Sequence, residues 1–247
     1  MLNARQGIAI MSERFYTSLQ IHLGTMELRG AEAHHLAVVS RISPGALIYL
    51  FSGDGLEYSA EVLEAKKNRV LLDVKSGNDV SREPKVQVTL LSPLPKSNRC
   101  DFLIEKLAEI GVHRFVPIDC EFSTIKNKQI NTEKLRRSVI EASKQCLRNH
   151  LMKIGDPLTF EQSITQVDKN ELNVIASIAP IASEPAFFGQ SEKVNIWVGP
   201  EGGFSNSEIA FATEQGIKAL SLGKTILRME TAAIVVATLA IHSKVAQ

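Results

Sequence analysis

Hydrophobic and polar positions alternate with a period of two in the first third of the chain. The alternation predicts strands at Ala46–Phe51, Leu56–Glu64 and Arg69–Val74, with a hairpin turn at Ser52-Gly53-Asp54-Gly55 between the first two. Gly30–Val39, which precedes them, has the spacing of a helix. We expect a β-rich domain of about six short strands that make a small barrel, a shape that often binds oligonucleotides.

A different pattern follows the polar, turn-rich segment Gly77–Pro84, where we place a domain boundary. The expected domains are residues 12–84 and residues 85–247. Short apolar runs in the second domain alternate with helical spacing, as in the helices expected at Asn98–Ile110 and Thr132–Arg148. This α/β pattern predicts a mostly parallel sheet. Its expected strands are Lys85–Ser92, Phe115–Ile118, Leu172–Ile178, Val194–Val198 and Ala219–Leu222.

The expected last helix, Thr231–Val245, is apolar on all sides and rich in small residues. At about 15 residues it is too short to span a membrane, which requires about 20. We therefore expect it to be buried, either in the core or at a dimer interface.

Composition restricts the class of protein but does not reveal a partner. The chain has 247 residues, of which 44% are hydrophobic and 22% charged, and its net charge is +1. These values fit a soluble globular protein of one or two domains, in which any basic surface must be local. Neither a zinc site nor a disulfide framework is expected from the spacing of Cys100, Cys120 and Cys146, and this favours a reducing cytoplasm. His34 and His35 are adjacent, so they point apart and predict no metal site.

The beginning of the sequence lacks the features of a signal peptide. Its apolar patch, Ile8–Met11, is too short for a signal peptide or a membrane span. Met11 is an alternative natural start, because the patterned sequence begins after it.

Two glycine-bearing turns near the end of the chain are the main candidate for chemistry. Val194–Val198 stops at Gly199-Pro200-Glu201-Gly202-Gly203, and Ala219–Leu222 stops at Gly223. The carboxyl ends of parallel strands meet at one edge of a sheet, and glycine lets a ligand approach the backbone closely. A pocket for a flat ligand is one interpretation, and a plain strand-to-helix loop is the other. The sequence contains neither the G-x-G-x-x-G motif of dinucleotide-binding folds at these turns nor the G-x-x-x-x-G-K-[ST] motif of a P-loop.

These turns carry a specific double motif. Val198–Phe204 (VGPEGGF) followed by Leu222–Ala232 (LGKTILRMETA) resembles the paired signature of RsmE-type methyltransferases of the SPOUT class. The ending Glu109–Val112 (EIGV) of one expected helix and Glu141–Arg148 (EASKQCLR) of another also resemble that family. The resemblance implies a C-terminal α/β domain with a trefoil knot and an N-terminal PUA-like barrel that binds RNA. It further implies methylation of a uridine N3 in 16S ribosomal RNA of the small subunit, S-adenosyl-L-methionine as cofactor, and a homodimer.

The resemblance assigns the site residues. Leu222 and Leu227 would sandwich the adenine. Arg228 and Glu201 would be catalytic, with Arg228 stabilising negative charge on the uracil ring. A loop salt bridge for Glu201, an ion pair of Arg228 with Glu230 or Glu201, and a helix N-cap role for Thr231 are the structural alternatives. The expected cofactor-binding residues are Gly199, Pro200, Glu201, Gly202, Gly203, Leu220, Ser221, Leu222, Gly223, Leu227, Arg228 and Thr231.

Five cations are expected to bind RNA: Arg14, Arg41, Lys96, Arg99 and Arg148. A solvated surface charge is the alternative for each of them. No metal is expected, because methyl transfer needs positioning and electrostatics but neither a metal nor a covalent intermediate.

Two departures from the family pattern affect individual contacts. The chain has Lys224-Thr225 where many members have an arginine, and Lys224 cannot replace a bidentate guanidinium. Met229 stands where the pattern has a hydroxyl residue. Two alternative functions stay open: a SPOUT methyltransferase that modifies a ribose 2′-hydroxyl or transfer RNA, and a non-catalytic RNA-binding assembly factor.

Overall fold

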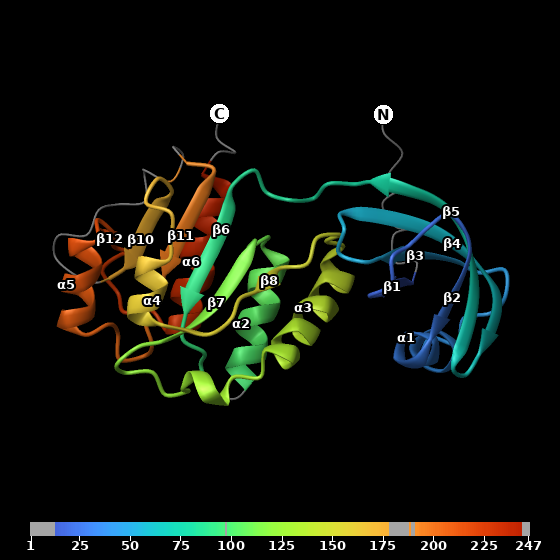
Figure 1. The fold of residues 1–247 in the computed structure, drawn as a ribbon, viewed down its shortest axis with the longest axis horizontal. Helices are drawn as coiled ribbons and strands as arrows, with labels where there is room; N and C mark the ends of the chain where they lie inside the picture. The colour runs from blue at the N-terminus through green and yellow to red at the C-terminus, as the bar shows by residue number, and fades with distance from the viewer. Residues whose placement is uncertain (1–12, 97, 178–187, 189–190, 244–247) are drawn as a thin grey trace. The chain divides into compact units, whose positions relative to one another are not determined.

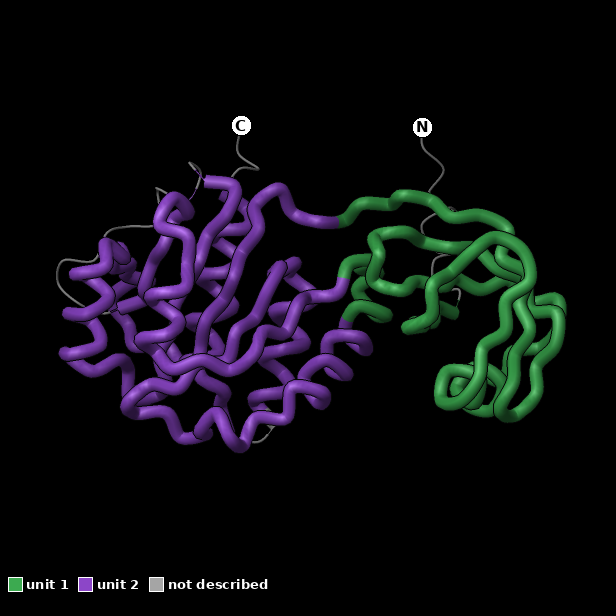
Figure 2. The backbone as a smooth tube through the Cα atoms, viewed as in Figure 1, with its two compact units in different colours: residues 1–82, 143–150 green, residues 83–142, 151–247 purple. Residues whose placement is uncertain are grey.

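The computed structural model describes residues 13–96, 98–177, 188 and 191–243, so the predicted start at Met11 lies outside the described residues. The chain divides into two compact units (Figure 2). Unit 1 contains the described residues up to Arg82 and the segment Ser143–His150, and unit 2 contains the rest. The boundary expected after residue 84 did not anticipate that Ser143–His150 belongs to unit 1. The division into domains 12–84 and 85–247 stays a prediction.

Unit 1 is built on a five-stranded sheet with the order β1-β3-β4-β5-β2. All of its pairs are antiparallel except β1 with β3. We expected about six short strands, but β4 and β5 have eleven residues each and are bent by register shifts at Ser59/Ala60 and Val62/Glu64. The strands are β1 (Arg14–Tyr16), β2 (Gly24–Arg29), β3 (Leu47–Phe51), β4 (Leu56–Lys66) and β5 (Arg69–Asp79).

The predicted helix at Gly30–Val39 is present in two parts. α1 (Gly30–His34) continues into a π-helical turn, η2 (His35–Val39). Ala33 and Leu36 bury this segment against the sheet. A core of alternating strand residues, among them Leu28, Ile48 and Leu72, fills unit 1.

Unit 2 contains a parallel sheet with the order β12-β10-β11-β6-β7-β8, and β9 also pairs with β7 (Figure 1). Every recorded strand pair in this sheet is parallel, as predicted. β8 and β9 were not predicted, because two residues carry no readable alternation. The strands are β6 (Gln87–Ser92), β7 (Arg114–Asp119), β8 (Lys153–Ile154), β9 (Leu158–Thr159), β10 (Leu172–Ala176), β11 (Lys193–Trp197) and β12 (Lys218–Leu220).

Helices cover both faces of this sheet. Residues of α2, α3 and α6 share one apolar cluster with Leu90 and Ile196, whereas α4 and α5 pack with Leu91 and Trp197 on the other face. Trp197 also donates its indole N–H to Ser163 Oγ at 2.9 Å. The helices are α2 (Asn98–Glu109), α3 (Thr132–Cys146), α4 (Phe160–Thr165), α5 (Asn206–Glu214) and α6 (Met229–His242).

The last helix, α6, is buried on one side only. Its inward residues recur every three or four positions, as Met229, Ala233, Val236 and Ala240 show. Leu239 is 40% exposed on the other side, so the core of this chain buries α6 only in part, and its burial at a dimer interface stays a prediction. None of the described helices is both long enough and apolar enough to cross a membrane.

Candidate active site

The two predicted turns line one cavity of about 330 Å³. β10 lies between β11 and β12 in the sheet, so all three strands end at the same edge and bring the turns together. The cavity has both apolar walls and exposed backbone. Its lining residues are Ala176, Ser177, Val198, Gly199, Pro200, Glu201, Gly202, Gly203, Phe204, Ile209, Leu222, Gly223, Thr225, Ile226, Leu227, Met229 and Ala232.

The first turn, Gly199–Gly203, is closely packed at its start, whereas a Cβ on Gly203 would meet no atom within 4 Å. Gly203 has φ +75° and donates its N–H to the carbonyl of Pro200 at 2.8 Å. A Cβ on Gly199 would lie 3.1 Å from the Phe204 ring and 3.2 Å from the carbonyl carbon of Gly203. A side chain at position 199 would therefore crowd the Phe204 ring and the Gly203 backbone, so packing favours glycine at this position.

The second turn, residues 221–227, has far fewer contacts. Gly223 has φ +121°, and a Cβ there would meet no atom within 4 Å. Ser221 Oγ lies 3.4 Å from the Gly223 amide, the outer limit of a hydrogen bond. Lys224 and Thr225 are exposed, and Ile226 is 84% exposed although it lines the cavity.

A capping box fixes the start of α5 directly after the first turn. Ser205 Oγ accepts from the Glu208 amide at 3.3 Å, and Glu208 Oε2 accepts from the Ser205 amide at 2.8 Å. The sequence spacing predicted this box, and the structure confirms it. Glu208 Oε1 additionally accepts from the backbone N–H of Glu121 at 2.9 Å, which ties the loop after β7 to α5.

Arg99 connects two carboxylates beside the cavity. Its Nη2 lies 3.0 Å from Glu201 Oε1, and its Nη1 lies 3.5 Å from Glu230 Oε1. Glu230 is only 6% exposed, and its Oε2 has no hydrogen-bond partner among the described residues. The predicted alternative of a loop salt bridge for Glu201 is confirmed. Arg99, however, takes the place that the sequence analysis gave to Arg228 as partner of these carboxylates.

Burial also affects the neighbouring thiol of Cys100. Cys100 follows Arg99 in α2, and desolvation, assisted by the Asp101 carboxylate, raises the pKa of Cys100 to about 11. No group of three or more metal-ligating side chains occurs among the residues described.

Eight of the twelve predicted cofactor-binding residues line the cavity. They are Gly199, Pro200, Glu201, Gly202, Gly203, Leu222, Gly223 and Leu227. The other four are absent from its lining: Leu220, Ser221, Arg228 and Thr231. Cofactor contact stays a prediction for all twelve.

Ser221 is half-buried in the second turn, and the other three residues lie elsewhere. Leu220 is fully buried in β12. Arg228 is exposed at the N-cap of α6, and Thr231 is exposed in the first turn of that helix. Because Arg228 occupies the N-cap, the N-cap alternative for Thr231 was wrong.

The wall at the end of β10, formed by Ala176 and Ser177, was not predicted from the sequence. No glycine motif marks these residues. The signal that would have found them is strand order, since a strand between two site-forming strands must end at the same edge.

Of the three predicted RNA-binding arginines in unit 1, Arg14 is half-buried and Arg148 is buried. Arg14 Nη2 donates to the Arg148 carbonyl at 3.0 Å and to Asn149 Oδ1, and its guanidinium lies 4.2 Å from the centre of the Phe51 ring. Desolvation by burial lowers the pKa of Arg14 to about 10. Arg148 is 3% exposed. The structure gives Arg14 a packing role, and contact of either arginine with RNA stays a prediction.

The other three predicted RNA-binding cations reach the surface. Arg41 is exposed and has φ +53°, a left-handed conformation that is uncommon outside glycine. Lys96 is exposed after β6. The side chain of Arg99 is 40% exposed, but its charge is engaged by the two carboxylates described above.

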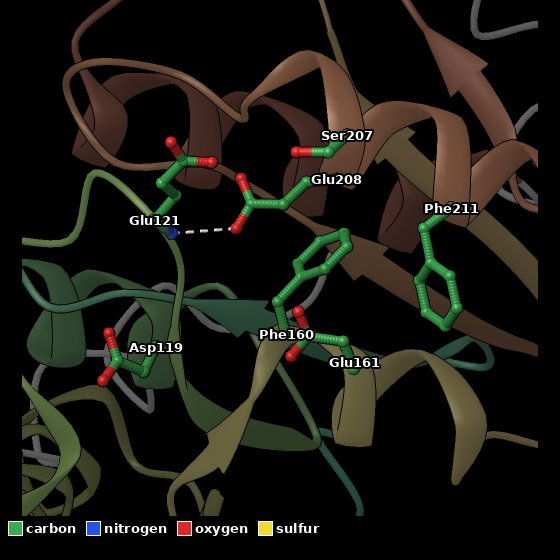
Figure 3. A pocket seen from close by; sticks show the side chains of 7 residues that line it. All are labelled: Asp119, Glu121, Phe160, Glu161, Ser207, Glu208 and Phe211. Atoms are coloured by element: carbon green, nitrogen blue, oxygen red, sulfur yellow. Dashed lines mark hydrogen bonds between the residues drawn. The ribbon is translucent and has the colours of Figure 1, made fainter.

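A second cavity of about 440 Å³ lies between α4, α5 and the end of β7 (Figure 3). Figure 3 shows Glu208 directed toward the backbone of Glu121, with Phe160 and Phe211 beside it. Four carboxylates line this cavity, which makes it unsuited to a phosphate-bearing ligand: Asp119, Glu121, Glu161 and Glu208.

Comparisons with known proteins agree across both units. Residues 82–241 match the model of an RNA methyltransferase domain, and residues 28–75 match that of an RNA methyltransferase PUA domain. The chain is 32% identical to a ribosomal RNA small subunit methyltransferase E from Synechocystis, with 86% of this chain and 71% of that protein covered. It is 30% identical to the Bacillus subtilis protein of that name, with 84% and 86% covered.

Solved structures show the same similarity. A ribosomal RNA small subunit methyltransferase E from Neisseria gonorrhoeae, bound to S-adenosyl methionine, superposes with a TM-score of 0.86 at 27% identity, covering 95% of this chain and 98% of that one. A methyltransferase from Legionella pneumophila with bound cofactor SAM gives a TM-score of 0.83 at 29% identity, covering 92% and 96%.

Proposed function

Since the chain belongs to the ribosomal RNA small subunit methyltransferase E family, we propose that it uses S-adenosylmethionine to methylate N3 of a uridine in 16S ribosomal RNA. The observation that carries this proposal is the single cavity lined by both halves of the double motif. The small ribosomal subunit or its RNA is the expected substrate.

The cavity residues fit the cofactor. Its volume of about 330 Å³ lies in the range of small-molecule sites. Leu222, Leu227 and Ile209 offer aliphatic surface to a purine, and the glycine turn offers backbone at close range. Glu201 places a carboxylate in the lining, which suits a ligand with cationic groups. The bound cofactor supplies an electrophilic methyl group on a sulfonium cation.

The protein's own catalytic work is to position the base and stabilise charge. N3 of uracil carries a proton at neutral pH, so negative charge grows on the ring as that proton leaves. Arg228, exposed at the N-cap of α6, is assigned the neutralisation of this charge. Glu201 is held at 3.0 Å by Arg99 and is assigned the orientation of the cationic ligand, while water accepts the proton.

Three further properties belong to this proposal. A homodimer would cover the exposed side of α6, where Leu239 is 40% exposed. The trefoil knot is expected from the family resemblance. The cytoplasm is the expected location, because the cysteines are free and the substrate is ribosomal.

The decisive experiment incubates the protein and labelled cofactor with small subunits that lack the modification, with free 16S RNA, and with transfer RNA. Mass spectrometry of the nucleosides should find N3-methyluridine in the ribosomal RNA. A 2′-O-methyl product or labelled transfer RNA would identify a different methyltransferase. Absence of cofactor binding by calorimetry would favour the assembly-factor alternative.

Arg228→Ala tests the catalytic assignment. We expect turnover to fall about 100-fold, the usual effect of removing one charge-stabilising group, with cofactor affinity intact. Lys193→Ala is the matched control, because Lys193 is exposed at the start of β11, the end of the strand opposite the cavity, and forms an ion pair with Glu171. Near-normal turnover of Arg228→Ala would refute this role.

A further inference from the structure

An exposed aromatic ring lies directly against the first turn. Phe122 follows β7 and is 48% exposed. A Cβ on Gly202 would lie 3.2 Å from Phe122 Cβ and 3.5 Å from its Cγ. Gly202 lines the cavity, so Phe122 lies at the edge of the proposed reaction site.

The backbone that carries this ring is anchored on both sides. The Ser123 amide donates to the Cys120 carbonyl at 3.1 Å, and the Cys120 amide donates to Ser123 Oγ at 2.8 Å. The Glu121 amide donates to Glu208 Oε1, the bond drawn in Figure 3. Large apolar side chains are usually buried, whereas here a fixed backbone presents a ring to solvent. A ring that is already ordered can bind a flat partner without a further loss of loop entropy.

The sequence after the ring is locally basic. Residues 121–137 contain five basic and two acidic side chains, although the whole chain has a net charge of only +1. All five cations are exposed: one precedes the short helix η3 (Asn127–Gln129), one lies within it and three lie on α3. Three of the five also form ion pairs at the surface, with Asp119, Asp101 and Glu133. They are Lys126, Lys128, Lys134, Arg136 and Arg137. An aromatic ring followed by exposed cations is the combination that binds single-stranded nucleic acid by stacking and phosphate contacts.

We propose that Phe122 stacks on the target base when that base is turned out of the RNA strand toward the cavity. The basic segment would then bind phosphates of the same strand. This inference rests on the proposed function, because it assumes an RNA substrate. Stacking on a side chain is a common way of holding a base that has left its own stack. The ring orients the base, and Arg228 retains the charge-stabilising role, so Phe122 is a positioning residue.

The test compares Phe122→Ala with Phe122→Tyr. Stacking on one aromatic side chain corresponds to about 5- to 150-fold in affinity, so we expect Phe122→Ala to lower kcat/KM for RNA within that range. Phe122→Tyr should restore most of the activity, and cofactor affinity should change less than about twofold in both variants, since only the RNA is held by the ring. Phe102→Ala is the matched control: Phe102 is 46% exposed on α2, lies outside the cavity lining, and its ring is approached by Lys106. It should leave kcat/KM unchanged.

A direct readout uses RNA in which the target base is a fluorescent pyrimidine analogue. Stacking should quench its emission with the wild-type protein and Phe122→Tyr, but not with Phe122→Ala. Unchanged quenching and kcat/KM in Phe122→Ala would overturn the inference. So would a wild-type dimer that Phe122→Ala dissociates in sedimentation, because a second copy would then cover the ring. If the wild-type protein itself methylates no RNA, the proposed function fails instead.

Discussion

The two turns that share the cavity differ in how they are held. In the first turn, Gly199 leaves no room for a Cβ without close contacts, and Arg99 holds Glu201 at 3.0 Å. In the second turn, Gly223 has open space around it, and Ile226 is 84% exposed. The same cavity therefore has one wall fixed by packing and one wall with few contacts.

This difference shows that glycine can occur in two similar turns for two different physical reasons. Glycine at position 199 is favoured because neighbouring atoms crowd the space for a side chain, whereas glycine at position 223 is favoured because its φ is +121°. A packed wall keeps its shape without ligand, and a wall with few contacts can adjust to a ligand at low cost.

The largest effect is expected from Gly199→Val. Its branched side chain would collide with the Phe204 ring and with the Gly203 backbone, which lie 3.1 and 3.2 Å from the nearest Cβ position. Backbone cannot move aside as a flexible side chain can, so the turn must shift. We expect cofactor affinity, measured by calorimetry, to fall about 100-fold or more, since a displacement of about 1 Å at a site can cost that much.

The matched control for this substitution is Ala176→Val, which also adds bulk to the cavity lining but at a strand end. It should reduce affinity less. Normal cofactor affinity of Gly199→Val would show that the first turn rearranges as readily as the second, and that packing does not fix its conformation.

An intermediate effect is expected from Arg99→Ala. The variant leaves Glu230, which is 6% exposed, without its recorded cation, and an unpaired buried charge is costly. The 3.5 Å contact and the half-exposed arginine reduce this cost, so we expect the free energy of unfolding in urea to fall by about 2 kcal/mol. Loss of the more exposed Glu201 pair should contribute at most about 1 kcal/mol of this.

Two further variants make this prediction specific. Arg99→Ala combined with Glu230→Gln should recover much of the loss, because the amide removes the buried charge. Arg136→Ala, which breaks the exposed pair with Glu133, should cost less than about 0.5 kcal/mol. An equal cost for Arg99→Ala and Arg136→Ala would mean that the first turn is not held by this cluster.

The two turns could be predicted, because the local amino-acid sequence and the ends of the strands determine them. The capping box of Ser205 and Glu208 and the parallel sheet followed from spacing and period alone. Arg99 illustrates the opposite case. It is 102 residues from Glu201 along the chain, so no local pattern shows that its charge is already engaged.

Arg14 teaches the same lesson in unit 1. An arginine at the start of a strand has the sequence features of a surface cation, but its partners come from residues 143–150, at the end of a distant helix. The insertion of that segment into unit 1 depends on tertiary packing. Sequence periodicity contains no information about it, and this is also why the wall formed by Ala176 and Ser177 was missed.

The smallest effect is expected from Gly223→Ala. The new methyl group has space, so the only penalty is the positive φ, and we expect the free energy of unfolding to fall by about 1 kcal/mol. Cofactor affinity should change less than about fivefold, because a turn with few contacts can relax around the new residue. Calorimetry on Gly223→Ala and Gly199→Val under the same conditions gives the ratio of their losses in cofactor affinity.

Limited trypsin digestion adds a second readout, since Lys224 and Arg228 are exposed on either side of Ile226. Bound cofactor should slow cleavage there in both the wild type and Gly223→Ala, and cleavage at an unchanged rate would show that the ligand does not order this turn.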